Sequence, residues 1–262
     1  MKKLALKVFD VFGFRLEKKS SPDQRSKTIR TAPILAQQQI INRLGIANVC
    51  IFDVGANKGQ SAKTYRAAFP KADIYCFEPI PEMLVKLENQ FSTDNKIHIE
   101  PKAVAQKKGS ATFYVNAHVG SSSLLKRTSD EKRYYKKEHV QNDSIEVETI
   151  SLDEFVQENN ISKAHILKFD IQGGELQALK GAESLLRSGN TSIVYTEVSF
   201  TPLYDEAPLF DEIWSFLKHL GYTLYSMSNL HWAANGQILY GEATFVSEEM
   251  RENVIDKYPE ER

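Results

Sequence analysis

The chain has 262 residues, with 33 Lys and Arg against 34 Asp and Glu, so its formal net charge is −1. Hydrophobic residues make up 42% and charged residues 26%, a globular composition that excludes an extended disordered chain. A nucleic-acid binder usually carries a basic excess, so we expect no nucleic-acid partner. No run of 18 apolar residues occurs, and we therefore expect no transmembrane segment.

The cysteine content is low. Cys50 and Cys76 are the only cysteines, and each lies inside a short apolar run. This setting favours free, buried thiols over a disulfide or a metal site. Without a disulfide framework nothing indicates secretion, so we expect a cytoplasmic protein.

The first part of the chain differs from the rest. We predict an N-terminal helical appendage and linker over residues 1–47, followed by the main domain over 48–262. Near the start, apolar residues recur at helical spacing, at Leu4, Val8, Val11 and Phe12. This spacing predicts an amphipathic helix that either packs on the domain or contacts a membrane surface or a partner. Residues 15–32 have the polar, basic character of a linker, and 34–44 have helical periodicity.

From residue 48 onward, short apolar runs alternate with amphipathic segments. The predicted strands cover residues 49–54, 74–77, 97–99, 166–171, 193–198, 222–227 and 243–246, and the predicted helices cover 60–69, 81–91, 175–186 and 208–220. Such alternation predicts an α/β fold with a mostly parallel sheet and helices on both faces. An insertion with strands at 111–115 and 145–150 interrupts it. Its basic, aromatic segment 126–137 is either a lid over an acceptor or a solvated helical face.

The segment Asp53-Val-Gly-Ala-Asn-Lys-Gly59 lies where the first of these strands ends and a helix begins. In an open parallel sheet this junction is the usual ligand crevice. Gly55 and Gly59, on either side of Asn57, allow a ligand to lie against the main chain. The helix N-terminus offers N–H groups to a carboxylate, and Asp53 could meet an ammonium group. The methionine part of S-adenosylmethionine carries both groups.

Acidic residues follow three of the predicted strands. Glu78 follows the second strand, where a carboxylate can accept hydrogen bonds from a ribose diol. Asp170 comes at the end of the strand that precedes Gly173-Gly174, and Glu197 at the end of the next strand. Acidic groups that converge in one crevice repel each other unless a ligand or cation lies among them. Their arrangement therefore indicates a binding site.

These residues belong to a series that resembles the FkbM-family methyltransferases over roughly residues 48–246. The series comprises Asp53-Val-Gly-Ala-Asn-Lys-Gly59, Phe77-Glu78-Pro79, Lys102-Ala-Val-Ala105, Ser121-Ser-Ser123, Ser151-Leu-Asp153, Lys168-Phe-Asp-Ile-Gln-Gly-Gly-Glu175, Leu179-Lys-Gly181 and Thr196-Glu-Val198. The order of the whole series is more specific than any single motif.

The resemblance implies a Rossmann-like class I methyltransferase fold with a seven-stranded sheet and S-adenosylmethionine as methyl donor. It also implies O-methylation of a hydroxyl on a sugar, glycolipid or related natural product, with a glycan as the preferred acceptor. By the same resemblance Ala103 and Val104 should lie near the adenine, and Ser122 near the cofactor or acceptor. The family usually has Glu where this chain has Gln172, so a role for that carboxylate cannot be carried over.

Methyl transfer to a hydroxyl needs a general base, because an alcohol is a poor nucleophile at neutral pH. The candidates are Asp170, Glu197 and His231, the last in what we expect to be a polar loop beside Trp232. The histidines show no metal-ligand spacing, and we predict no metal, although the three acidic strand ends could hold Mg²⁺ beside a catechol-like acceptor.

Two other functions remain open at this stage. A NAD-dependent oxidoreductase shares the fold and the ribose-binding acid, but it would normally carry a Gly-x-Gly-x-x-Gly turn. The other is a non-catalytic nucleoside- or partner-binding module; a module that binds only a partner would have no need of Gly55, Gly59 and Glu78. The acceptor and the oligomeric state do not follow from the sequence.

Overall fold

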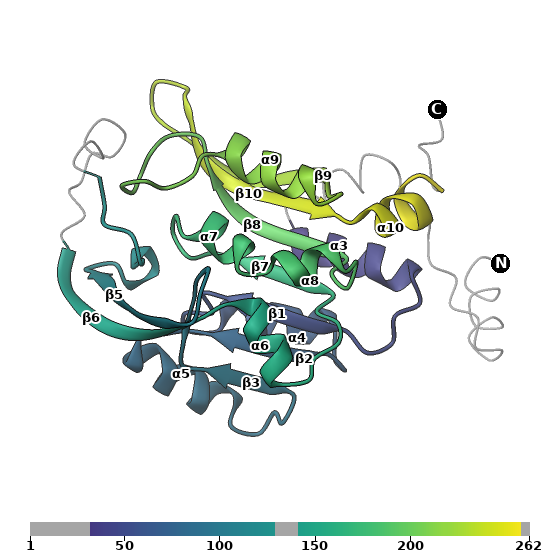
Figure 1. Cartoon of the computed structure of the whole chain (residues 1–262), viewed down its shortest axis with the longest axis horizontal. Coiled ribbons are helices and arrows are strands. Elements are labelled where there is room, and N and C mark those ends of the chain that lie inside the picture. Colours follow the sequence, from purple (N-terminus) through teal and green to yellow (C-terminus); the bar gives the residue numbers. More distant parts are fainter. Residues whose placement is uncertain (1–31, 129–140, 258–262) are drawn as a thin grey trace, which may run out of the picture.

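The computed structural model describes residues 32–128 and 141–257, and its central feature is a seven-stranded sheet in the order β3-β2-β1-β7-β8-β10-β9 (Figure 1). Within the sheet β10 is antiparallel to both its neighbours, and the other strand pairs are parallel. The strands are β1 (Cys50–Val54), β2 (Asp73–Phe77), β3 (Ile97–Glu100), β7 (Ile166–Phe169), β8 (Ile193–Ser199), β9 (Thr223–Trp232) and β10 (Ile238–Val246). The predicted mostly parallel α/β sheet is confirmed.

Helices cover both faces of this sheet, which explains why its central strands are continuous apolar runs. One hydrophobic core joins the sheet to α6 (Leu152–Glu158), α7 (Glu175–Lys180), α8 (Glu183–Arg187) and α9 (Phe210–His219). The second core joins the opposite face to α3 (Pro33–Arg43), α4 (Gln60–Ala68), α5 (Pro81–Phe91), α10 (Glu248–Met250) and η3 (Arg251–Ile255). Because β1, β2 and β7 are parallel, the strand ends that precede α4, α5 and α7 lie along one edge of the sheet.

The predicted insertion forms a second, three-stranded sheet of its own. Its order is β4-β6-β5, with β4 (Ala103–Val104), β5 (Gly109–Asn116) and β6 (Gln141–Ile150), and η1 (Val119–Ser121) follows β5. Phe113 and Val147 from this sheet bury their side chains with Ile80 and Met83 at the start of α5. The small sheet lies at one end of the molecule, beside the carboxyl ends of β1 and β2 (Figure 1). The segment 129–140, which contains most of the predicted lid, lies outside the described residues.

The sequence analysis did not predict α6 or β4, and two predicted elements differ from the structure. The predicted helix 175–186 is two helices, because the chain passes close to β4 between them: a Cβ on Gly181 would lie 2.3 Å from the carbonyl oxygen of Ala105. The prediction that His231 lies in a loop was wrong, because β9 runs on to Trp232 and pairs His231 with Tyr240. This end of β9 is exposed on both faces and so lacks the apolar pattern that marks a covered strand.

The chain ahead of β1 is described only from residue 32. Within α3, Ile40 and Ile41 are buried in the second core, so this helix is packed on the sheet. The predicted amphipathic helix near residue 4 lies outside the described residues. Within the described ranges, no helix has the length and hydropathy needed to cross a membrane. Both cysteines are free.

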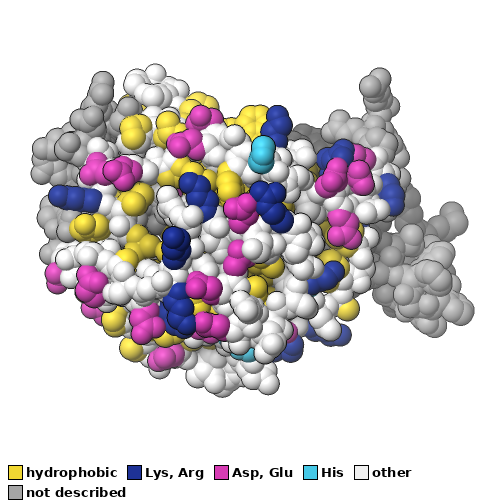
Figure 2. All heavy atoms as spheres, viewed as in Figure 1, with side chains coloured by type: hydrophobic (Ala, Val, Ile, Leu, Met, Phe, Trp, Pro, Cys, Tyr) yellow, Lys and Arg dark blue, Asp and Glu magenta, His cyan; other side chains and the backbone are white. Residues whose placement is uncertain are grey.

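The surface shown in Figure 2 mixes basic and acidic side chains, with hydrophobic ones scattered between them. This face presents no extended field of one sign. The carboxyl ends of β1, β2 and β7 form one edge of the large sheet.

The loops after β1 and β7 touch at that edge. A Cβ on Gly55 would lie 2.0 Å from the carbonyl oxygen of Asp170, and Gly55 has a φ of +80°. Only glycine combines that left-handed backbone with such close approach. The contact between these loops therefore depends on the absence of a side chain.

We predict that Gly55→Ala destabilises the protein far more than Gly45→Ala. Gly45 has a φ of +69° but open space around its Cβ position, so this control variant measures backbone strain alone, about 1 kcal/mol. The clash at Gly55 should add roughly 1–3 kcal/mol. Urea unfolding followed by circular dichroism measures both values, and equal losses would contradict the inferred loop contact.

Candidate active site

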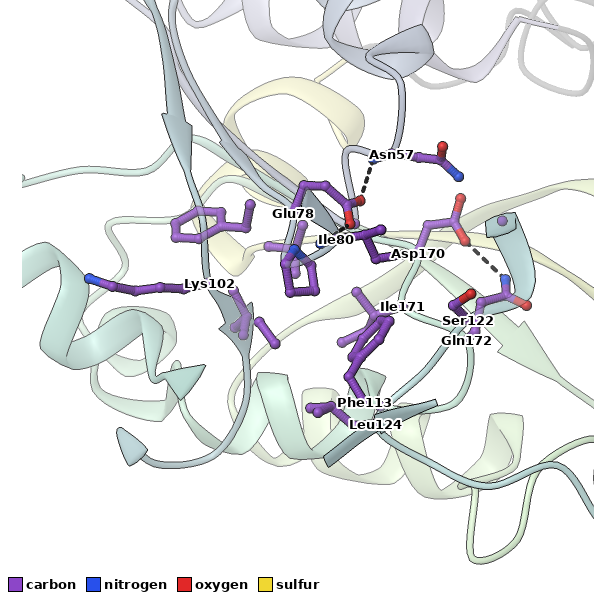
Figure 3. Close-up of a pocket in the computed structure, with 18 of the residues that line it drawn as sticks. Asn57, Glu78, Ile80, Lys102, Phe113, Ser122, Leu124, Asp170, Ile171 and Gln172 are labelled. Carbon is purple, nitrogen blue, oxygen red and sulfur yellow. Dashed lines mark hydrogen bonds between the residues drawn. The ribbon is translucent and has the colours of Figure 1, made fainter. Parts of the chain in front are cut away.

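A pocket with an empty volume of about 540 Å³ lies at the carboxyl ends of β1, β2 and β7 (Figure 3). Seven residues selected from the sequence line it together: Gly55, Asn57, Glu78, Ala103, Val104, Ser122 and Asp170. They come from both sheets, so the predicted convergence at this edge is observed.

Glu78 is the buried acid of this pocket. Its side chain is only 4% exposed, and its two oxygens accept hydrogen bonds from the backbone N–H groups of Asn57 (2.8 Å) and Ile80 (2.9 Å). Burial raises the pKa of Glu78 to about 7, although the two hydrogen bonds counteract this rise. Each carboxylate oxygen keeps a second lone pair, so the same group can order two loops and still accept bonds from a diol.

The opposite side of the pocket is apolar. Ala103 and Val104 come from β4, while Phe113 comes from β5 and Leu124 follows η1. Ser122 completes this wall, and its hydroxyl accepts a hydrogen bond from the backbone N–H of Asn116 at 3.0 Å. An acid on one side and apolar side chains on the other suit a nucleoside, which has a polar ribose and a flat base.

Asp53 faces a buried lysine rather than the pocket. Its side chain has no exposed surface, and Lys168 Nζ lies 2.9 Å from its Oδ1. The same ammonium donates to the carbonyl oxygen of Gly55 at 3.1 Å and lies 3.8 Å from Asp170 Oδ2. Burial disfavours the charge on Lys168, but Asp53 and Asp170 outweigh this effect and raise its pKa. This position of Asp53 differs from the expected contact with a ligand ammonium.

Asp170 and Glu197 are joined through Gln172. The Gln172 amide nitrogen donates to Asp170 Oδ1 at 3.1 Å and to Glu197 Oε2 at 2.7 Å. Asp170 remains 46% exposed, whereas burial and the charges of Asp170 and Glu175 raise the pKa of Glu197. The two predicted acids are therefore neighbours, and Asp170 is the more accessible one.

A second, more open cavity with about 1160 Å³ of empty volume adjoins the first. Gly55, Asn57 and Asp170 line both cavities, and Lys58 and His118 line the second alone. Asp170 thus lies where the two cavities meet. A ligand in one cavity and a second ligand in the other would both reach its carboxylate.

The remaining candidates lie farther out. His231 stacks on Tyr240, with ring centroids 4.3 Å apart, and lines neither cavity. Burial and the charges of Glu197 and Asp170 raise the pKa of Tyr240. Gly59 also lines neither cavity. It begins α4 with a φ of +84°, and a Cβ there would lie 2.7 Å from the Phe91 ring.

The sequence analysis assigned no role to Lys168 or Tyr204. A lysine inside the apolar run Ile166–Phe169 was a visible signal, because a buried charge needs a partner. Tyr204 gave no such signal: its hydroxyl donates to Gln172 Oε1 at 2.8 Å, a contact that only the folded chain reveals. In the described part of the chain, no cluster of three His, Cys, Asp or Glu residues could hold a metal ion.

Comparison with known proteins identifies the family. Residues 53–224 match the Methyltransferase FkbM domain, and this segment contains the pocket, the paired acids and the small sheet. The chain belongs to the FkbM methyltransferase family, and it is an enzyme that uses S-adenosylmethionine. Membership of this family excludes the alternative of a NAD-dependent oxidoreductase.

Two relatives have names that specify the methylated position or the sugar. The 2-O-methyltransferase NoeI of Sinorhizobium fredii is 26% identical over 182 residues, which cover 67% of this chain and 73% of that protein. The hexuronic acid methyltransferase AglP of Haloferax volcanii is 28% identical over 169 residues, covering 62% of this chain and 64% of AglP. Just under two-thirds of AglP is thus matched.

Among solved structures, the magnesium protoporphyrin IX methyltransferase ChlM of Synechocystis PCC 6803 has a TM-score of 0.44 and 11% identity to this chain. The alignment covers 94% of this chain and 97% of ChlM. The class I methyltransferase fold is seen directly in the strand order, with its single reversed strand β10.

The pocket fits the nucleoside half of the cofactor. Glu78 can hold the ribose, and Ala103, Val104 and Phe113 can cover the base, while Gly55 and Asn57 border the second cavity. When bound there, S-adenosylmethionine supplies a methyl group already activated by its sulfonium. The residues that surround it need only position the acceptor and accept its proton.

We predict that Lys168→Met lowers the free energy of unfolding by roughly 3–5 kcal/mol, because it leaves the buried Asp53 carboxylate without its cation. The double variant Asp53→Asn, Lys168→Met should recover part of this loss, since no charge then remains unpaired there. Urea unfolding of the two variants and the parent gives the coupling. A loss below about 1 kcal/mol for Lys168→Met would contradict the account.

We also predict that affinity for S-adenosylhomocysteine falls as the pH drops from 8 to 6. The ionised Glu78 carboxylate is the form that accepts bonds from the ribose hydroxyls, and a pKa of about 7 makes it mostly protonated at pH 6. The loss should be roughly tenfold. Calorimetric titration measures it, and Glu78→Gln should bind weakly with little dependence on pH. A flat profile for the parent would contradict this role.

Proposed function

We propose that this methyltransferase acts on a hydroxyl oxygen of a sugar or glycan and that Asp170 is its general base. The position of Asp170 at the junction of the two cavities is the observation that carries this proposal. A cofactor bound against Glu78 and an acceptor in the adjoining cavity would both meet this carboxylate. Its 46% exposure leaves it accessible to an acceptor hydroxyl.

The names of the two relatives support the chemical class. NoeI is named a 2-O-methyltransferase, and AglP is named for a hexuronic acid. Transfer to oxygen needs a base within reach, and Asp170 Oδ2 can take the proton of the hydroxyl as the oxygen becomes methylated. Lys168 Nζ lies 3.8 Å from that oxygen.

The other predicted residues take supporting roles in this proposal. Gly55, Asn57, Glu78, Ala103, Val104 and Ser122 form the cofactor pocket, and Asp53 acts through Lys168 instead of touching the ligand. Glu197 supports Asp170 through Gln172, and His231 stacks on Tyr240 away from the residues that line the two cavities. We assign residues 48–262 to the catalytic domain, with 1–47 as the appendage, and propose that the enzyme works in the cytoplasm.

We predict that Asp170→Asn lowers kcat by about 10²–10⁴-fold while the affinity for S-adenosylhomocysteine changes by less than about threefold, or 0.6 kcal/mol. The assay follows transfer of a radioactive methyl group to oligosaccharides containing either neutral sugars or hexuronic acids. Asp211→Asn, an exposed change on α9, is the matched control and should retain full activity.

The product distinguishes the acceptor group. A methyl ether on a hydroxyl survives mild alkali, whereas a methyl ester on a carboxylate does not. An alkali-labile product would contradict hydroxyl methylation, and undiminished turnover by Asp170→Asn would remove Asp170 as the base.

A further inference from the structure

Gln172 occupies the centre of the polar network beside Asp170. Its amide nitrogen donates to Glu197 Oε2 at 2.7 Å and to Asp170 Oδ1 at 3.1 Å, while its Oε1 accepts from the Tyr204 hydroxyl at 2.8 Å. One side chain thus uses both amide hydrogens on two carboxylates from neighbouring strands. Figure 3 shows the bond from Gln172 to Asp170 at the rim of the pocket.

We propose that Gln172 is a positioning residue: it holds Asp170 and Glu197 together as two hydrogen-bond-accepting carboxylates and aims Asp170 at the acceptor, with Tyr204 setting the orientation of the amide. The part concerning the acceptor rests on the function proposed above. The part concerning the two carboxylates can be tested without any substrate.

In this chain an amide satisfies all three neighbours at a position where the family usually has a glutamate. Two carboxylates held this close repel each other, and each gains a stabilising hydrogen bond from a separate N–H of Gln172. A glutamate in the same place would bring a third carboxylate against the other two and would donate nothing when ionised. A further carboxylate beside Glu197 would add to the charges of Asp170 and Glu175, which already raise the pKa of Glu197.

The acids and Tyr204 together set the orientation of the amide. Ionised carboxylates accept hydrogen bonds only, so they select the nitrogen, and the oxygen then accepts from the Tyr204 hydroxyl, which also lies 2.9 Å from the carbonyl oxygen of Ser121. Burial raises the pKa of Tyr204, with Arg127 opposing the rise, so the hydroxyl keeps its proton at neutral pH. The Arg127 guanidinium packs over the Tyr204 ring, 5.0 Å from the centroid, which holds the ring in place.

The backbone at Gln172 supports a role for its side chain. Its φ is +60°, a left-handed conformation that glycine adopts at lower cost. Glu175 holds this turn, because its carboxylate accepts from the N–H groups of Ile171 (2.9 Å) and Gly173 (2.8 Å). A long amide side chain at such a position indicates that its hydrogen bonds offset the backbone strain.

Two carboxylates, two basic side chains and two tyrosines surround this pair. The titratable groups that face Glu197 and Asp170 come from β7, α7, β10 and the segments around residues 127 and 204, and they are Lys168, Glu175, Tyr240, Glu242, Arg127 and Tyr204. Burial and the charges of Asp170 and Glu175 raise the pKa of Glu197, whereas the Gln172 hydrogen bond lowers it. Loss of that hydrogen bond, or its replacement by a negative charge, should therefore raise the pKa of Glu197.

The test is a pH titration of the side-chain carboxyl carbons of Asp and Glu by ¹³C NMR, on the full chain without cofactor. Signals of the pair are assigned by their loss in Asp170→Asn and Glu197→Gln. We expect Gln172→Glu to raise the midpoint of the pair by at least about one pH unit. Gln177→Glu makes the same change on an exposed position of α7 and should leave the midpoint unchanged.

Tyr204→Phe is the second variant, because it keeps Gln172 and removes only the hydroxyl that orients it. It should raise the midpoint by a smaller amount, and it decides the question if Gln172→Glu does not fold. With an active acceptor, the acidic limb of the kcat–pH profile should move with the NMR midpoint, while the KM for S-adenosylmethionine stays unchanged.

Midpoints that match the parent in the folded variants would overturn the proposal. An acidic limb that stays in place while the NMR midpoint moves would overturn its catalytic part. If no sugar accepts a methyl group from the parent enzyme, the proposed function fails, but the NMR titration still decides whether Gln172 holds the two carboxylates.

Discussion

The site depends on one buried ion pair, between Asp53 at the end of β1 and Lys168 in the neighbouring strand β7. These residues are direct partners in the parallel register, so the strand pairing itself brings their charges together. Lys168 also donates to the carbonyl oxygen of Gly55, which ties the β1–α4 loop to β7. Two charges without solvent are stable only as a pair, and this requirement holds the two loops in one arrangement.

The other parts of the site follow from that arrangement. With the loops in contact at Gly55 and Asp170, the Asn57 N–H reaches Glu78, and this links the second strand to the first loop. Asp170 is then left between two cavities, next to Lys168 on one side and Gln172 on the other. Asp53 thus balances the buried charge of Lys168, whereas Asp170 remains accessible in the crevice.

The sequence predicted the large sheet well, because strands covered on both faces are apolar throughout and strands such as β1 and β7 show this directly. The acids at the strand ends were also found, since parallel strands place their carboxyl ends along one edge. Glu78 and Asp170 consequently proved to line one pocket. The sequence pattern could not predict the interaction partner of each acidic side chain, as the burial of Asp53 against Lys168 shows.

The remaining differences also have physical causes. Apolar periodicity does not say which sheet a strand joins, so β5 and β6 were expected as an insertion but not as a sheet that covers the pocket. His231 was placed in a loop because the exposed end of β9 carries no apolar alternation. Tyr204 and Gln172 meet across 32 positions of the chain, and no local signal in the sequence could pair them.

The most direct test of the central claim is a crystal structure of the enzyme with S-adenosylhomocysteine. The account predicts that the ribose hydroxyls bond to Glu78, that the adenine lies against Ala103 and Val104, and that the sulfur faces Asp170. It also predicts that Asp53 stays paired with Lys168 and does not touch the ligand amine. A ligand bound away from Glu78, or an Asp53 that leaves Lys168 for the amine, would contradict it.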